Sequence, residues 1–176
     1  LRKWRQTCAE GGGLCPPVRD SRRAMADPLP PAYAAPAARA RIALVAESFA
    51  RLLGRPLVVA GDDAVAALWQ APFAVVAHGV EADPLFFFGN RAALVAFDTD
   101  VAGFTGMPSR LSAEPLARAE RQALLDRVTR DGFIDDYAGM RISARGRRFR
   151  IAGAVVWNLI DAAGQRHGQA ATFAHP

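Results

Sequence analysis

The segment 147–161 constrains the fold of this chain more than any other, because it is long, strand-forming and apolar on both faces. Large side chains recur along it with the period of two that puts them on one face of a strand: Phe149, Ile151, Val155, Trp157 and Leu159. The opposite face begins with two arginines and continues as Ala152, Ala154, Val156, Asn158 and Ile160. A strand that is apolar on both faces needs cover on both. We expect the helix predicted at 37–53 to cover this second face.

Four more segments share the strand pattern and are bounded by turn residues. The five expected strands span 73–78, 85–88, 133–143, 147–161 and 165–173. The first two flank a polar turn and predict a hairpin, and the last three are joined by short turns and predict a meander. Together they predict a five-stranded antiparallel sheet.

Helical periodicity precedes this sheet and separates its two parts. One amphipathic helix is expected over 37–53, with its apolar stripe formed by Ile42, Val45, Phe49, Leu52 and Leu53. Gly54 ends this helix, and Asp62 is expected to cap a second one. After the hairpin, short helices are expected with their caps at Asn90 and at one of Asp98, Thr99 and Asp100. A longer helix is expected from Pro115 to 131, ended by Gly132.

These elements predict one α+β domain over 37–174, with helices on one face of the sheet and the N-terminal helix on the other. This is the PAS-like arrangement. Four prolines within 26–36 predict an extended linker, and 1–36 as a whole is expected to be a disordered basic and Pro-rich tail. Met25 is interpreted as the natural start, with 1–24 as translated upstream sequence. The alternatives for 1–24 are an inert tail and a basic arm that binds nucleic acid or anionic lipid.

The net charge of +5 lies almost entirely in the segment 1–24, which holds six of the 22 basic and two of the 17 acidic residues. The remainder is close to neutral, so nucleic-acid binding by the folded body is not expected. Both cysteines, Cys8 and Cys15, lie in the same segment. The body therefore offers no thiol for a flavin adduct, and we expect it to be cytoplasmic. No apolar run approaches the ~18 residues of a membrane span, so no membrane association is expected.

Polar residues inside the apolar strands are the candidates for a site, because a buried polar group needs a partner. Six residues are candidate ligand-binding residues: Arg141, Tyr137, Trp157, Gln169, His78 and Asn158. An internal hydrogen-bond network is the alternative interpretation. A buried Arg141 requires a carboxylate, from Asp135, Asp136, Glu114 or a ligand. The small residues of the stretch 168–171 would let a backbone or a flat ligand approach closely.

Catalytic and metal sites are not indicated. His78, Glu81 and Asp83 share the hairpin turn but lack a metal-binding spacing. Ser112, His78 and Asp135 could be combined into a triad, but no nucleophile-elbow motif supports it. The sequence indicates no particular cofactor.

Four stretches carry a family resemblance: APFAVVAHGVEADPLFFFGNRAAL (71–94), PSRLSAEP (108–115), GFIDDYAGMRIS (132–143) and RRFRIAGAVVWNLIDAAGQRHGQAATF (147–173). They resemble the MEKHLA domain, which ends plant class III homeodomain–leucine zipper transcription factors and also occurs as small stand-alone bacterial proteins. The bacterial type matches best, over about 40–173. The resemblance implies a PAS-like fold and a sensory or interaction role. It implies no ligand, no reaction and, without a homeodomain, no DNA binding.

Three functions follow as hypotheses. The first is a cytoplasmic sensor that binds a small molecule between sheet and helices and signals through protein–protein contacts. The second is a ligand-free interaction domain that forms a homodimer. The third is a small enzyme built around Arg141 and His78. A pocket of roughly 300 Å³ or more would distinguish the first from the second.

Overall fold

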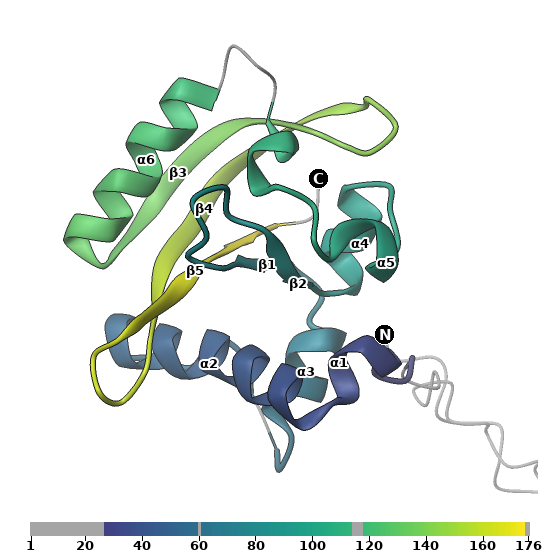
Figure 1. Cartoon of the computed structure of the whole chain (residues 1–176), viewed down its shortest axis with the longest axis vertical. Helices are drawn as coiled ribbons and strands as arrows, with labels where there is room; N and C mark the ends of the chain where they lie inside the picture. Colours follow the sequence, from purple (N-terminus) through teal and green to yellow (C-terminus); the bar gives the residue numbers. More distant parts are fainter. Residues whose placement is uncertain (1–26, 60, 114–117, 175–176) are drawn as a thin grey trace, which may run out of the picture.

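The computed structural model describes residues 27–59, 61–113 and 118–174, without the side chains of 118–121. Its centre is an antiparallel sheet with the strand order β2-β1-β5-β4-β3 (Figure 1). The strands are β1 (Ala74–His78), β2 (Phe86–Gly89), β3 (Phe133–Ile142), β4 (Arg148–Ile160) and β5 (Arg166–Phe173). The predicted five-stranded sheet is confirmed, and β5 lies at its centre between β1 and β4.

Helices cover both faces of this sheet. On one side lie α1 (Pro31–Ala34), α2 (Pro36–Leu53) and α3 (Ala64–Gln70). The other elements are α4 (Arg91–Ala96), α5 (Val101–Phe104), the 3-10 turn η1 (Ser109–Ser112) and α6 (Arg118–Asp131). Figure 1 shows α1, α2 and α3 gathered beneath the sheet, with α6 lying apart from α4 and α5.

Side-chain caps set the helix starts, as the sequence indicates for Asn90 and Asp100, whose side-chain oxygens accept from backbone amides of α4 and α5. The cap of α3 is Asp63 and not the expected Asp62, because Asp63 directly precedes the helix and its carboxylate accepts from two backbone amides. The same carboxylate pairs with Arg39 of α2 at 2.7 Å. This contact joins α3 to α2.

The linker prediction is wrong at α1. Pro31 occupies the first helical position, where a missing N–H does no harm, and a helical turn follows. Tyr33 in this turn is 1% exposed and packs against the rings of Trp69 and Phe88. Proline content indicated an extended chain, but the burial of one aromatic ring favours the turn. The expectations for 1–24, including Met25, lie outside the described residues.

The face assignment of β4 is also wrong, because the strand contains a β-bulge. Tyr137 pairs with Ala154 while Gly139 pairs with Ile151, so β4 has one extra residue at this point. Gly153 lies there with φ +60°, a conformation that glycine adopts readily. Odd-numbered residues of β4 before the bulge therefore face one side of the sheet, and odd-numbered residues after it face the other side.

Contacts on the two sides of the bulge show the change. The ring of Phe149 lies 5.2 Å from that of Phe97, on the α4 side of the sheet. The ring of Trp157 lies 4.9 Å from that of Phe49, on the α2 side, and its Nε1 donates to Val45 O. Thus α2 covers the Trp157 face, and α6 covers the face of Val156 that we had assigned to α2.

The apolar stripe of α2 is confirmed as cover for the sheet within one chain. Ile42, Val45 and Phe49 are fully buried, and Leu52 is partly buried. Ser48 adds a polar contact, since its hydroxyl bonds both the N–H and the C=O of Ile160 in β4.

None of the helices in the described part of the chain has the length and apolar character that a membrane span requires.

We predict that Phe49→Asp destabilises the domain by about 3 kcal/mol or more, because it replaces a core ring with a buried charge. Ala50→Asp, at the neighbouring exposed position near the end of α2, is the matched control and should cost only about 1 kcal/mol, through helix propensity and the helix dipole. Urea denaturation followed by circular dichroism measures both. Equal stability of the two variants would contradict the burial of Phe49.

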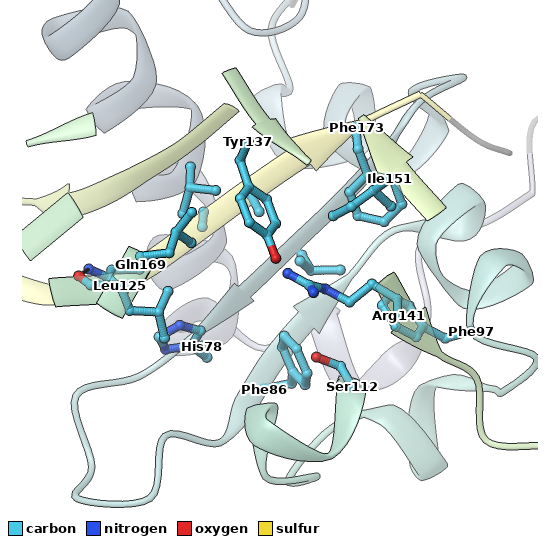
Figure 2. Close-up of a pocket in the computed structure, with 15 residues that line it drawn as sticks. His78, Phe86, Phe97, Ser112, Leu125, Tyr137, Arg141, Ile151, Gln169 and Phe173 are labelled. Atoms are coloured by element: carbon cyan, nitrogen blue, oxygen red, sulfur yellow. Dashed lines mark hydrogen bonds between the residues drawn. The ribbon is translucent and has the colours of Figure 1, made fainter. Parts of the chain in front are cut away.

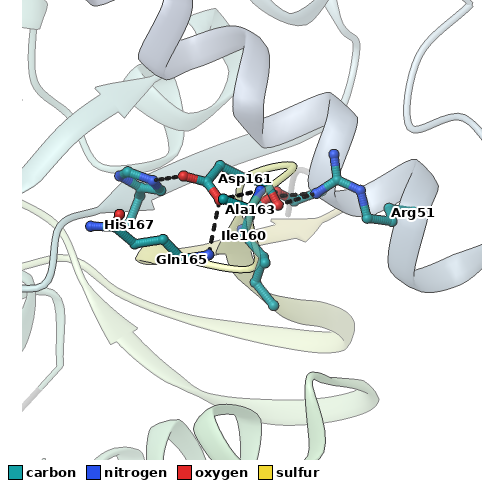
Figure 3. A network of polar contacts seen from close by, with 7 residues as sticks. Arg51, Ile160, Asp161, Ala163, Gln165 and His167 are labelled. Carbon is teal, nitrogen blue, oxygen red and sulfur yellow. Dashed lines mark hydrogen bonds and ion pairs between the residues drawn. The ribbon is translucent and has the colours of Figure 1, made fainter.

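The turn between β4 and β5 is organised by Asp161 (Figure 3). Its carboxylate accepts hydrogen bonds from the backbone of Ala163 and Gln165 and contacts His167 Nε2 at 2.8 Å. Arg51 of α2 donates to the backbone oxygen of Asp161. The hydrogen bond from His167 is the largest cause that lowers the pKa of Asp161 from its ordinary value.

A lowered pKa means that the folded state favours the charged carboxylate. The resulting stability is present above the unfolded-state pKa of about 3.9 and is lost as pH falls through the lower folded-state pKa. We therefore predict that Asp161→Asn lowers the melting temperature more at about pH 6 than at about pH 2.5. Asp62→Asn, at an exposed position, is the control and should change the melting temperature by the same small amount at both pH values. Thermal melts at the two pH values test this.

Candidate functional site

A small cavity lies between the sheet and the elements that cover it on the α6 side (Figure 2). Its volume is about 40 Å³, and ten of the 15 lining residues are apolar. The polar and charged residues that line it are His78, Ser112, Tyr137, Arg141 and Gln169. Every strand of the sheet contributes to the lining, together with η1 and α6.

Arg141 is the charged group of this cavity. It lies on β3 opposite Phe149 and is 8% exposed. Its Nη1 donates to the backbone oxygen of Met140 at 2.9 Å, and its guanidinium lies 5.0 Å from the ring centre of Tyr137. Among the described residues, no carboxylate lies within 4.0 Å of it, so its charge has no ionic partner there.

The expected protein partners of Arg141 are not observed. Asp135 and Asp136 are exposed at a second bulge, where Ile134 and Tyr137 pair with Val156 and Ala154. This bulge puts two β3 residues, Asp135 and Asp136, opposite one of β4, and neither carboxylate is among the cavity side chains. Glu114 lies outside the described residues.

Gly139 brings Tyr137 and Arg141 together. A Cβ atom at Gly139 would lie 2.2 Å from Tyr137 Oη and 3.4 Å from Arg141 Nη1. The tyrosine side chain therefore lies across the glycine, and Figure 2 shows its hydroxyl directed toward the guanidinium. We did not identify Gly139 from sequence. The sequence contains a signal for it, because the pattern Tyr-x-Gly-x-Arg places Tyr137, Gly139 and Arg141 on one face of a strand. The glycine leaves space between the two large side chains.

Gln169 and Asn158 anchor α6 to the sheet. They are opposite one another on β5 and β4, and Gln169 Nε2 donates to Asn158 Oδ1. The Gln169 amide also donates to Leu125 O, and the Asn158 amide donates to Val128 O at 2.8 Å. For these two residues the alternative of an internal network is what the structure shows. Gln169 also lines the cavity.

His78 is at the edge of the cavity. Its Nδ1 lies 2.9 Å from Gly79 O, and its ring makes an edge contact with that of Phe86. Its backbone oxygen would lie 1.9 Å from a Cβ at Gly168, so the small residue there permits the close approach of a backbone and not of a ligand. On the α6 side the cavity adjoins an open polar groove of about 390 Å³, which shares His78, Leu125 and Gln169 with it.

Of the six candidate residues, the structure brings four to the cavity: Arg141, Tyr137, Gln169 and His78. Trp157 lies on the opposite face against α2, and Asn158 is held in the α6 network, so including these two in the cavity was wrong. The error at Trp157 follows from strand parity, which the bulge at Gly153 reverses. Asn158 lies on the cavity side of the sheet, but α6 covers it and accepts the hydrogen bonds of its amide. Sequence reasoning missed Ser112, Phe97 and Ile151, which line the cavity from separate elements.

In the described part of the chain, the candidate groups for metal binding and nucleophilic catalysis have other partners or lie apart. Within the described residues, no three His, Cys, Asp or Glu side chains are placed to hold a metal ion. Asp83 pairs with Arg110 and Glu81 lies 3.8 Å from Arg41. Ser112 Oγ donates to the backbone oxygen of Ser109, and Asp135 is exposed.

Strand order, two-sided helical cover and an internal cavity define a PAS-type α+β domain. Solved structures with this fold include a PAS domain from Colwellia psychrerythraea, at 12% identity, a TM-score of 0.55 and coverage of 62% of this chain and 91% of that one. A light-oxygen-voltage domain with a flavin analogue is similar at 15% identity and a TM-score of 0.52, over 64% of this chain and 83% of that one. The light-state dimer of the fungal photoreceptor Vivid is similar at 12% identity and a TM-score of 0.53, over 73% of this chain and 91% of that one.

Within this class, residues 39–175 match the model of the MEKHLA domain, and the chain belongs to that family. No curated protein sequence matches the chain. The family and the fold that the sequence resemblance implied are thus confirmed.

We predict that Gln169→Leu loosens α6 and leaves the sheet intact, because it removes the hydrogen bonds of the Gln169 amide to Leu125 O, Thr129 Oγ1 and Asn158 Oδ1. Amide hydrogen exchange should rise at least about 10-fold in 122–131 and change little in β4 and β5. Gln165→Leu, in an exposed turn, is the matched control and should alter neither region. Unchanged exchange in α6 would contradict the anchoring role.

Proposed function

We propose that this MEKHLA domain is a sensory module that binds a small molecule at Arg141 and signals through protein–protein contacts in the cytoplasm. The observation that carries the proposal is that Arg141, inside an apolar cavity, has no carboxylate partner among the described residues. A buried guanidinium without an anion is costly, and a bound anion removes that cost. A ligand is therefore favoured at this point of the fold.

Signalling requires that binding changes a surface. Gln169 lines the cavity and also holds α6 on the sheet, so a ligand that contacts Gln169 competes with α6 for the same amide. Related folds support this use, since Vivid is a photoreceptor whose light state is described as a dimer. We propose that the surface around α6 changes in an analogous way here, without catalysis.

A second function, a ligand-free interaction or homodimerisation domain, is favoured by the size of the cavity. A volume of about 40 Å³ is well below the ~300 Å³ of typical small-molecule pockets. In this alternative the guanidinium is stabilised by the Tyr137 ring, the Met140 carbonyl and water.

Native mass spectrometry of freshly purified protein distinguishes the two functions. We predict that the wild-type domain carries a small non-protein mass that denaturation releases, and that Arg141→Met lacks it. Arg150→Met, at an exposed position of β4, is the matched control and should retain the mass. A wild-type domain that carries no added mass and forms a dimer would support the interaction domain instead.

A further inference from the structure

The shape and chemistry of the cavity limit what Arg141 can bind, and this inference rests on the proposed function. We propose that the ligand is a short-chain monocarboxylate whose carboxylate binds the guanidinium and whose alkyl chain occupies the apolar part of the cavity. Four features of the described residues lead to this class: charge, hydrogen-bonding geometry, lining and volume.

The charge of the ligand is one negative unit. Arg141 carries the cavity's one permanent charge among the described lining residues. The other titratable groups there are Tyr137 and His78, and His78 already contacts Gly79 O. A dianion would leave its second charge among apolar side chains without a partner, which is strongly unfavourable.

The hydrogen-bonding geometry favours a carboxylate. One guanidinium nitrogen already donates to Met140 O, and within the described part of the chain the remaining N–H groups have no acceptor. A planar guanidinium holds a carboxylate through two parallel hydrogen bonds. The Tyr137 hydroxyl, which lies over Gly139 beside Arg141 Nη1, provides a third donor.

The lining and the volume favour a short alkyl chain. Beyond the polar groups the walls are aliphatic and aromatic, including Ile151, Val156 and Phe97. The volume of about 40 Å³ accommodates only a few non-hydrogen atoms. A longer chain would emerge into the adjoining groove, whose walls include Arg110, Asp126 and Arg166 and offer little apolar contact.

Isothermal titration with propanoate, propanamide, succinate and octanoate at constant ionic strength tests the inference. We expect propanoate to bind the wild-type domain and the others to bind at least about 10-fold more weakly, since a charge-assisted hydrogen bond contributes roughly 1.5–3 kcal/mol, or about 10- to 100-fold. Arg141→Met should weaken propanoate by a similar factor, and Arg150→Met should leave it within about twofold.

Three further variants keep the test informative if Arg141→Met does not fold. Arg141→Lys retains the charge but not the planar fork, and should weaken propanoate at least about 10-fold. Gly139→Ala should weaken it as well, because the new methyl group displaces the Tyr137 hydroxyl. Tyr137→Phe removes the hydroxyl and keeps the packed ring, so it should weaken propanoate while the melting temperature stays close to that of the wild type.

The results separate this inference from the proposed function. Equal binding of propanoate and propanamide overturns the carboxylate assignment, and unchanged propanoate binding by Arg141→Lys overturns the two parallel hydrogen bonds from the guanidinium. If native mass spectrometry detects a released molecule that is large or not acidic, the carboxylate inference fails and the sensor proposal stands. If no mass is detected and no probe binds, both fail.

Discussion

The double burial of β4 is the constraint on which the rest of this structure depends. A strand that carries Trp157 on one face and Val156 on the other is stable only inside a layer with helices on both sides. The N-terminal α2 provides one layer through Phe49, and α6 provides the other through Val128. Removing either layer would expose apolar surface that the sheet has no other means to cover.

The two layers are attached by different forces. The main hydrophobic core includes α2 and its ring contacts to Trp157. In contrast, α6 forms a separate small cluster and depends on hydrogen bonds from the amides of Asn158 and Gln169. Each of these hydrogen bonds contributes only about 1 kcal/mol net, because water can replace it when α6 moves away. The helix α6 is therefore held less firmly than α2. The fold therefore combines a fixed layer with a more easily displaced one.

Most of the architecture could be predicted from the sequence, because period, turns and caps are local signals. The strands at 133–143 and 165–173, the stripe of α2 and the cap at Asn90 all follow from residue spacing. The face of each β4 residue could not be predicted, because Gly153 also fits an ordinary strand and the bulge depends on pairing with β3. Placing Trp157 in the cavity was an error with this cause. Arg141 and Tyr137 do lie together at the cavity, because they share one face of β3 in the regular stretch that follows its own bulge.

The position of Gln169 connects the cavity to the displaceable layer. Any occupant larger than a few atoms requires the cavity to expand, and the walls differ in how much they resist. The wall formed by β1, β4 and β5 belongs to the sheet, where expansion would break strand pairing. The wall formed by Leu124 and Leu125 belongs to α6, where expansion breaks a few side-chain hydrogen bonds. A ligand shifts an equilibrium only by its difference in affinity for the two states. An occupant that enlarges the cavity therefore acts first on α6, and the surface that α6 presents is where occupancy of this cavity becomes visible to a partner.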